Sequence, residues 1–232
     1  MSRGLPLLFV VGLAACGGAA PEPAAPPYVS KADLAVMVLP QEELDPLAEG
    51  FVIASDRSGW KTHKKAARET VDPEDSAAFL TARGRVGGYE LAYESPKRRP
   101  RQESSLVATS VELLRDEIYA SEFLNKQVDD FESRAGLSHS GVKLAGVRLF
   151  DVPGVGDEAA GVRAVLSAEG RRLYLTLALL RRGRIVGAAA VVRAEKHRME
   201  TEIVSLAKAL DRRIQDVIAG RIEGDPVPLP TS

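Results

Sequence analysis

The sequence contains two apolar octets, "LYLTLALL" at residues 173–180 and "IVGAAAVV" at residues 185–192, joined by Arg181-Arg182-Gly183-Arg184. The short link places a glycine where a hairpin turn needs a positive φ, so the pair predicts two antiparallel strands. Both octets are apolar at odd and at even positions, whereas a strand with one solvated face would alternate. Both faces of these strands must therefore be covered, by helices or by a lined cavity.

A long amphipathic helix is predicted over residues 195–221. Its apolar residues recur at intervals of three and four, as on one face of a helix; they are Met199, Ile203, Leu206, Leu210, Ile214 and Val217. We expect this stripe to pack on the strand at 185–192, because the small residues from Gly187 to Ala190 let a helix approach closely.

The remaining elements alternate between strand and helix patterns. "RVGGYELAYES" places Tyr89, Leu91 and Tyr93 on one side of a strand, and "SLVATSVELL" reads as its neighbour. Further strands are predicted at 51–54, 143–150 and 158–167. Helices are predicted at 60–69, at 73–83 with Asp72 as cap, as a turn from Leu39, and at 116–134, where the apolar positions are Ile118, Phe123, Leu124, Val128 and Phe131. This order predicts a single α+β domain with a mainly antiparallel sheet, helices packed on it and a long C-terminal helix.

The N-terminus has the pattern of an export signal. Arg3 supplies a positive charge, the apolar run from Leu5 to Leu13 is too short to span a bilayer, and small residues follow. The order Leu13-Ala14-Ala15-Cys16 resembles a bacterial lipobox. The resemblance implies that residues 1–15 are removed and that Cys16 is lipidated and becomes the N-terminus. The alternative is an ordinary signal peptide with a cysteine near its cleavage site.

Lipidation fixes a location and a set of boundaries. A single acyl chain holds a protein only marginally, whereas two or three hold it stably, so Cys16 would anchor the chain to a membrane. We expect a lipid-anchored protein of the cell envelope, on the outer face of the plasma membrane or, in a diderm, on the outer membrane. The divisions are a signal peptide at 1–15, a Pro/Ala-rich tether at 16–34, the domain at 35–224 and a disordered tail at 225–232.

Composition narrows the function classes. Lys and Arg number 31 against 32 Asp and Glu, so the basic excess typical of nucleic-acid binders is missing and we expect no such partner. Cys16 is the only cysteine, which excludes an intramolecular disulfide. Two basic clusters, at 60–68 and 97–101, indicate contact with anionic headgroups or a cell-wall polymer, or else simple solubility. An envelope protein or a cell-wall component is the partner expected for the whole protein, beside the membrane that Cys16 would reach.

No catalytic or metal motif stands out. His63, His139 and His197 are isolated, which favours surface histidines and predicts no metal site. Asp129, Asp130 and Glu132 fit the solvated face of a helix better than an acid–base pair. Ser58, Ser138 and Ser140 lack a nucleophile-elbow context, which gives no support to a serine hydrolase. A turn is predicted at Pro153-Gly154-Val155-Gly156-Asp157-Glu158, because this segment lacks the lysine of a phosphate loop, and we expect Asp157 to bond the backbone of its own turn. We expect no cofactor.

A second resemblance concerns the order of elements. The segments "VRLFDVPGVGDEAAGVRAV", "TLALLRRGRIVGAAAVV" and "LAKALDRRI" are similar to a recurring pattern in exported proteins of high-GC bacteria, and the element order resembles the PsbP-like fold. The resemblance covers residues 86 to 222 and carries no catalytic motif. It implies a fold and no activity.

Three function classes follow. We expect a non-enzymatic accessory or binding lipoprotein; the alternatives are a carrier of an apolar ligand, like LolA-like carriers, and an enzyme of unrecognised type. A filled core between sheet and helices would exclude the carrier, and a cavity of several hundred cubic ångströms would favour it. A pocket with two convergent ionisable groups would favour the enzyme.

Overall fold

The structure is a computed structural model that describes residues 29–44, 46–69, 76–96, 106–139, 142–168, 171–194 and 199–230. Cys16, most of the expected tether, the basic cluster at 97–101, Ser140 and His197 lie outside these residues, as do the side chain of His139 and the last two residues of the expected tail. Predictions about them stay predictions.

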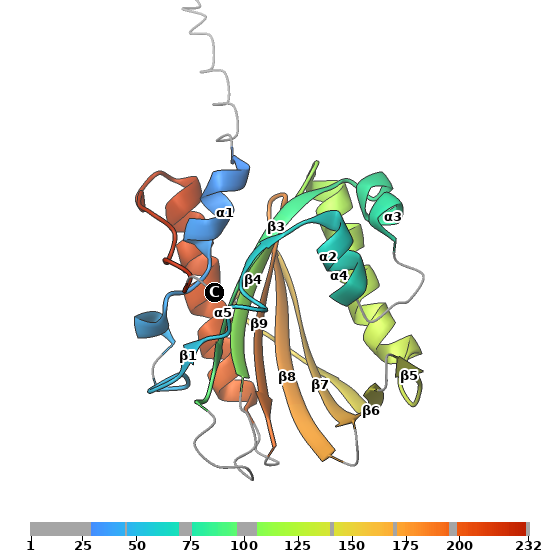
Figure 1. The fold of residues 1–232 in the computed structure, drawn as a ribbon. Helices are drawn as coiled ribbons and strands as arrows, with labels where there is room; N and C mark the ends of the chain where they lie inside the picture. The colour runs from blue at the N-terminus through green and yellow to red at the C-terminus, as the bar shows by residue number, and fades with distance from the viewer. Residues whose placement is uncertain are drawn as a thin grey trace, which may run out of the picture.

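Within the residues that the structure describes, a single antiparallel sheet of nine strands forms the centre of the domain (Figure 1). The order is β1-β3-β4-β9-β8-β7-β6-β5, with β2 also paired to β3, and every pair is antiparallel. The strands are β1 Val52–Ile53, β2 Gly59–Lys61, β3 Arg85–Glu94, β4 Leu106–Leu114, β5 Ser138–His139, β6 Val142–Phe150, β7 Glu158–Ala168, β8 Arg171–Arg182 and β9 Ile185–Arg193. The α+β class with a mainly antiparallel sheet is confirmed.

The two apolar octets form the predicted hairpin of β8 and β9. Arg182 pairs with Ile185, and Gly183 adopts a φ of 55° in the turn between them. Strand β9 pairs on its other side with β4, although some 80 residues separate the two in sequence. The pairing places β9 in the interior of the sheet, where helices lie over both of its faces, and this coverage explains why its residues are apolar on both sides.

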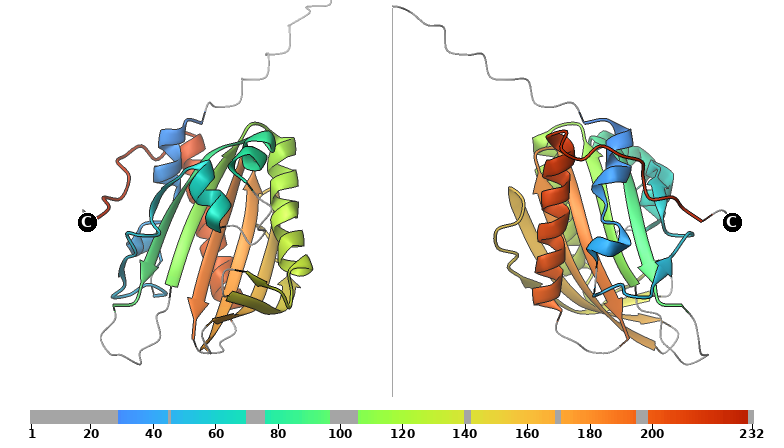
Figure 2. Two further views of the ribbon diagram at one scale, coloured as in Figure 1. Left: turned by 45° about the vertical axis from the view of Figure 1, so that its right-hand side comes forward. Right: turned by 90° about the vertical axis from the view of Figure 1, so that its left-hand side faces the viewer.

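Helices cover both faces of the sheet, as Figures 1 and 2 show. Helices α1 and α5 lie on one face, and helices α2, α3 and α4 lie over the other. Their bounds are α1 Lys31–Met37, α2 His63–Glu69, α3 Ala77–Ala82, α4 Glu117–Ser133 and α5 Glu200–Ile218, with a short 3-10 turn η1 at Gln41–Glu43.

The C-terminal helix packs as expected. Leu210 and Ile214 of α5 are fully buried against the sheet. A Cβ built on Gly187 would lie 3.2 Å from Leu210 Cδ2 and 3.3 Å from Ile214 Cδ1, so this glycine makes room for the helix. Close packing of α5 on β9 is thereby confirmed.

Helix α1 corrects the expected boundary of the tether. The chain is already ordered into the domain at Val29, which is 5% exposed, and Leu34 is completely buried. Ser30 and Asp33 form a capping box: the Ser30 N–H donates to Asp33 Oδ2 at 2.6 Å, and the Asp33 N–H donates to Ser30 Oγ at 3.4 Å. A helix therefore begins within the stretch that was expected to be linker.

The C-terminal tail also contacts the domain. Residues 222–230 are extended and cross over α1, visible in the right-hand view of Figure 2. Val227 and Leu229 are half-buried and pack against the core of the α5 face. The segment expected to be a disordered tail thus contributes apolar contacts up to residue 230, because two of its few apolar side chains find a surface beside α1.

Three local predictions differ from the structure. The helix expected at 73–83 is the shorter α3, whose N-cap is Ser76, while Asp72 lies outside the described residues. The segment expected as one helix from Trp60 divides into β2 and α2. Helix α4 has the predicted extent, but Ile118 is 71% exposed, because it lies off the face that buries Leu124 and Phe131.

Candidate functional site

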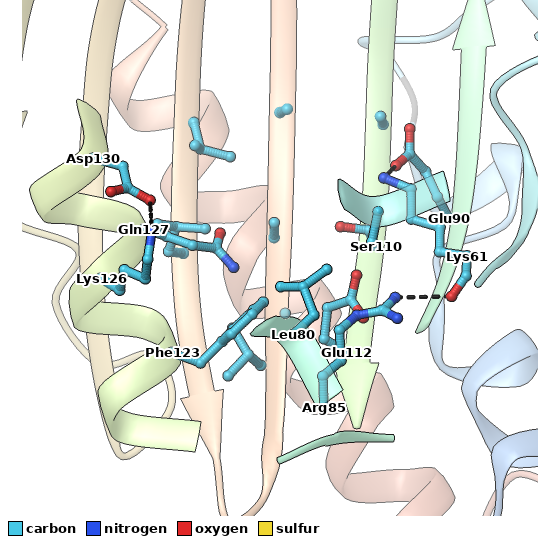
Figure 3. Close-up of a pocket in the computed structure, with 18 of the residues that line it drawn as sticks. Lys61, Leu80, Arg85, Glu90, Ser110, Glu112, Phe123, Lys126, Gln127 and Asp130 are labelled. Atoms are coloured by element: carbon cyan, nitrogen blue, oxygen red, sulfur yellow. Dashed lines mark hydrogen bonds and ion pairs between the residues drawn. The ribbon is translucent and has the colours of Figure 1, made fainter. Parts of the chain in front are cut away.

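A pocket of about 310 Å³ lies between the sheet and helices α2, α3 and α4. Figure 3 shows its residues, with α4 on one side and strands β3 and β4 on the other. The volume falls at the lower end of the range for small-molecule sites, roughly 300 to 1,000 Å³. It lies on the face of the sheet opposite α5, so the two faces differ in how completely they are filled.

Small side chains form the floor of the pocket. Ala188 and Ala190 of β9 are half-buried and line it together with Ala108, which stands opposite Ala190 in the β4–β9 register. Leu177 and Leu179 continue this floor on β8. Because alanine side chains extend so little above the sheet, they leave space beneath the helices.

A polar wall stands on β2, β3 and β4. The guanidinium of Arg85 places Nη2 2.6 Å from Glu112 Oε2, and the same Nη2 donates to the carbonyl of Lys61 at 2.8 Å. The Arg85 side chain is 0% exposed and that of Glu112 is 13% exposed. Lys61 in turn forms an ion pair with Glu90.

The register of β3 and β4 explains how Glu112 fits into this wall. Gly88 is its direct partner, and a Cβ on Gly88 would lie 2.1 Å from Glu112 Oε2. The carboxylate therefore folds over a glycine on the neighbouring strand. Any larger residue at position 88 would displace the carboxylate.

Burial changes the acidity of this carboxyl. Loss of solvation raises the pKa of Glu112 to about 7, even though Arg85 and Lys61 act in the opposite direction, and Glu90 adds to the rise. Glu112 therefore exchanges its proton near neutral pH. Such groups gather at functional sites, although structural ion pairs also produce them.

Helix α4 supplies the opposite wall. Phe123, Lys126, Gln127 and Asp130 line the pocket, and the Lys126 ammonium donates to Asp130 Oδ2 at 2.7 Å (Figure 3). Of the three helix carboxylates expected on a solvated face, Asp129 and Glu132 are exposed. Asp130 is the exception, since its side chain is only 14% exposed.

The other singled-out residues have structural surroundings. His63 is not a free surface histidine, because its Nε2 lies 2.7 Å from the carbonyl of Arg85. Ser58 is buried: its Oγ accepts from the Ala92 N–H at 3.1 Å and donates to the Ala92 carbonyl at 3.3 Å, whereas Ser138 is exposed. In the part of the chain that the structure describes, no three His, Cys, Asp or Glu residues are close enough to hold a metal ion.

The glycine-containing loop at 153–158 is a turn between strands, as expected, but Asp157 acts elsewhere. It accepts hydrogen bonds from the Gly183 N–H and from Arg182 Nη1, both at 2.7 Å. Asp157 therefore stabilises the turn between β8 and β9 and not the loop in which it lies. Arg182 also reaches the buried Asp211 on α5, so the loop, the hairpin and the helix are tied together.

The basic cluster at 60–68 divides between the pocket and the surface. Lys61 belongs to the polar wall, while Lys64 and Arg68 are exposed on α2. Trp60 is 49% exposed and stands edge-on to Tyr89, with ring centroids 5.1 Å apart. The cluster is therefore not one continuous basic patch.

Sequence reasoning missed Arg85 and Glu112. A signal existed for Glu112, since it interrupts the apolar run "SLVATSVELL" at an even position, and Gly87-Gly88 marks a place in β3 without side chains. Only the register of β3 and β4, which pairs Gly88 with Glu112, shows that these two features belong to one site.

The fold is similar to the crystal structure of the extracellular domain of PknH from Mycobacterium tuberculosis, with a TM-score of 0.53 and 13% sequence identity, over 82% of this chain and 98% of that chain. At that identity the likeness shows a shared fold alone. No protein-family model and no curated protein matches the chain. The resemblance to the PsbP-like fold stays a prediction.

Proposed function

We propose that this protein is an exported, lipid-anchored binding protein that holds a small, largely apolar ligand between its sheet and helices α2 to α4. The observation that carries the proposal is the pocket of about 310 Å³ over the alanine floor. At about 30 Å³ for each water-sized group, this volume takes roughly ten non-hydrogen atoms. The same pocket would serve a binding protein and a carrier of an apolar ligand, so the proposal includes both roles.

The opposite face of the sheet supports this assignment by contrast. There, α5 and α1 fill the space over the sheet, with Leu34, Ile203 and Leu210 all 0% exposed. Side chains therefore fill the space between the sheet and its helices on this face. The space on the α4 face is therefore a local feature and not a general looseness of packing.

Binding of 1-octanol, a neutral probe of suitable size, tests the proposal. Titration of the purified domain, followed by NMR shifts of the Ala188 and Ala190 methyl groups, is expected to show saturable binding. Ala190→Phe fills the floor and is expected to abolish it, whereas Ala135→Phe, the same change at an exposed position, is expected to leave it intact. Unaltered binding in Ala190→Phe would place the ligand elsewhere and refute the proposal.

Anchoring rests on the lipobox and is tested separately. Among the described residues no helix combines the length and apolarity needed to cross a membrane. The intact mass of protein extracted from membranes is expected to show cleavage before Cys16 plus acyl mass, and Cys16→Ser is expected to release the protein or stall its processing. A native protein cut elsewhere and found free of membranes would overturn this part.

An enzyme is the second candidate, because the pocket brings together Arg85, Glu112 and Lys61. A carboxyl with a pKa near 7 suits proton transfer at neutral pH. Turnover of a chromogenic ester that is lost in Glu112→Gln but kept in Glu132→Gln, on the exposed face of α4, would favour the enzyme over the binding protein.

A further inference from the structure

The polar wall of the pocket contains hydrogen-bond donors that the domain does not use. Nε and Nη1 of Arg85 are buried and have no hydrogen-bond partner among the described residues. The third guanidinium nitrogen, Nη2, lies 2.6 Å from Glu112 Oε2 and forms an ion pair with it. Leaving a buried donor unpaired is unfavourable, and more so for a charged group, so the two unpaired nitrogens favour binding of an acceptor.

The ion pair between Arg182 and the buried Asp211 shows what a fully hydrogen-bonded pair looks like in the same molecule. Asp211 accepts from Arg182 Nε at 3.0 Å and from Arg182 Nη2 at 2.8 Å. Its Oδ2 also accepts from the Gly156 N–H at 3.1 Å and from Gln215 at 3.0 Å. Arg182 and Asp211 therefore have the partners expected of a structural pair, whereas Arg85 and Glu112 do not.

We propose that the pocket binds an amphipathic monocarboxylic acid, whose carboxylate accepts hydrogen bonds from the Arg85 guanidinium and whose apolar chain lies over Ala108, Ala188 and Ala190. This inference rests on the proposed function, because it names the ligand class of the same pocket. An arginine donates readily to a carboxylate, and such charge-assisted bonds are about twice as strong as neutral ones.

The balance of charges around the pocket favours a ligand that carries a single negative charge. Lys61 is offset by Glu90, and Lys126 on α4 is offset by Asp130. Arg83, at the end of α3, is paired with Glu122 at 3.8 Å. Only Arg85 loses its counter-charge when Glu112 takes up a proton, and the raised pKa of Glu112 makes that uptake accessible near neutral pH. A bound carboxylate would then replace the charge of Glu112 beside Arg85.

The exchange of one carboxylate for another predicts a pH dependence. The charged groups facing Glu112 are Arg85 and Glu90 on β3 and Lys61 on β2; across the pocket stand Arg83 at the end of α3 and Lys126 and Asp130 on α4, while His63 of α2 contacts the backbone of Arg85. Below about pH 7 Glu112 is neutral and the ligand anion is attracted; above it, the ionised Glu112 repels the anion. Affinity is therefore expected to fall by roughly tenfold between about pH 6 and about pH 8.

Octanoate and 1-octanol, titrated into the same domain at both pH values, test the inference. The ligand carboxyl stays ionised over this range, since ordinary carboxyl pKa values lie near 4. Octanoate is expected to bind at least tenfold more tightly than 1-octanol at about pH 6, and that preference is expected to shrink at about pH 8. Equal binding of both probes at both pH values would make Arg85 and Glu112 a structural ion pair only and would overturn the inference, while binding of neither would refute the proposed function itself.

Two variants separate recognition from folding. The double variant Arg85→Met/Glu112→Met removes both charges, a change that is often tolerated, and is expected to lose the preference for octanoate over 1-octanol. Glu112→Gln keeps position 112 uncharged at every pH, so that Arg85 has no carboxylate counter-charge from this position, and is expected to bind octanoate equally well at both pH values. A preference that survives in the double variant, or a pH dependence that survives in Glu112→Gln, would overturn the inference.

Discussion

The two faces of strand β9 carry similar residues and have opposite surroundings. Gly187 and Ala189 face α5, where the space above them is filled by Leu210 and Ile214. Ala188 and Ala190, the alternate residues of the same strand, face the pocket. Small side chains therefore permit close packing on one face and leave a cavity on the other. The difference lies in what covers each face, since the long α5 fills one layer and the shorter, separated α2 to α4 do not fill the other.

Leu210→Ala is expected to give the largest effect and tests the filled face. Leu210 is 0% exposed, and truncation of a buried leucine removes about 2 to 5 kcal/mol from the free energy of unfolding. A urea titration of the soluble domain measures this loss. Lys208→Ala, on the exposed side of the same helix, serves as control and should stay within about 0.5 kcal/mol. If the midpoint for Leu210→Ala were unchanged, the stripe of α5 would face a partner and not the core.

Asp211→Asn is expected to rank second, because it weakens the polar junction at the end of the same face. Asp211 is 5% exposed and holds Arg182 through two oxygens. Loss of its charge removes one of the two carboxylates that hold Arg182; the other, Asp157, stays 2.7 Å from Nη1, and Arg182 is 29% exposed and can still reach water. We expect a loss of about 2 kcal/mol in the free energy of unfolding. Asp129→Asn, at an exposed position on α4, is the matched control, and equal losses in the two variants would remove the special role of the junction.

Gly187→Ala probes the closest approach of the helix to the sheet. The added methyl would lie 3.2 Å from Leu180 Cγ and 3.2 Å from Leu210 Cδ2, and both leucines are fully buried with little room to move. Overpacking of this kind costs about 1 to 2 kcal/mol. Thermal unfolding measures the change. A neutral or stabilising result would mean that α5 shifts to accommodate the methyl and that this face is less tightly packed than it looks.

The difference between the faces also separates what sequence could predict from what it could not. Periodicity correctly indicated the β8–β9 hairpin, the buried side of β3 that carries Tyr89 and Leu91, and the apolar stripe of α5. Each of these depends on the spacing of apolar residues within one short segment of the chain. The small residues from Gly187 to Ala190 predict close packing of the C-terminal helix, with a lined cavity over these strands as the alternative. Half of that prediction is confirmed, since only the odd-numbered positions face α5.

The candidate site depended on information that no local pattern carries. Arg85 and Glu112 meet because β3 and β4 pair in a register that places Gly88 beside Glu112. A single glutamate in a strand pattern reads as a solvent-facing residue, and only the helices above the sheet make it buried. The cavity likewise arises from the lengths and positions of α2, α3 and α4, which are tertiary properties. The capping box of α1, by contrast, has a local signal, since Ser30 and Asp33 stand three residues apart. The Pro-rich composition before it favours a linker, and the start of the helix was therefore not predicted.

Ala188→Val is expected to have the smallest effect on stability, and it sharpens the comparison because it changes the residue next to Gly187. Valine adds two methyl groups to the floor of a pocket of about 310 Å³, so the pocket offers them space. Valine also suits a strand better than alanine, and the free energy of unfolding should stay within about 0.5 kcal/mol of the parent. The same substitution narrows the floor and should weaken 1-octanol binding, measured in parallel with the urea titration. A loss of stability as large as that of Gly187→Ala would show that both faces of β9 are filled, and the binding proposal would then lose its physical basis.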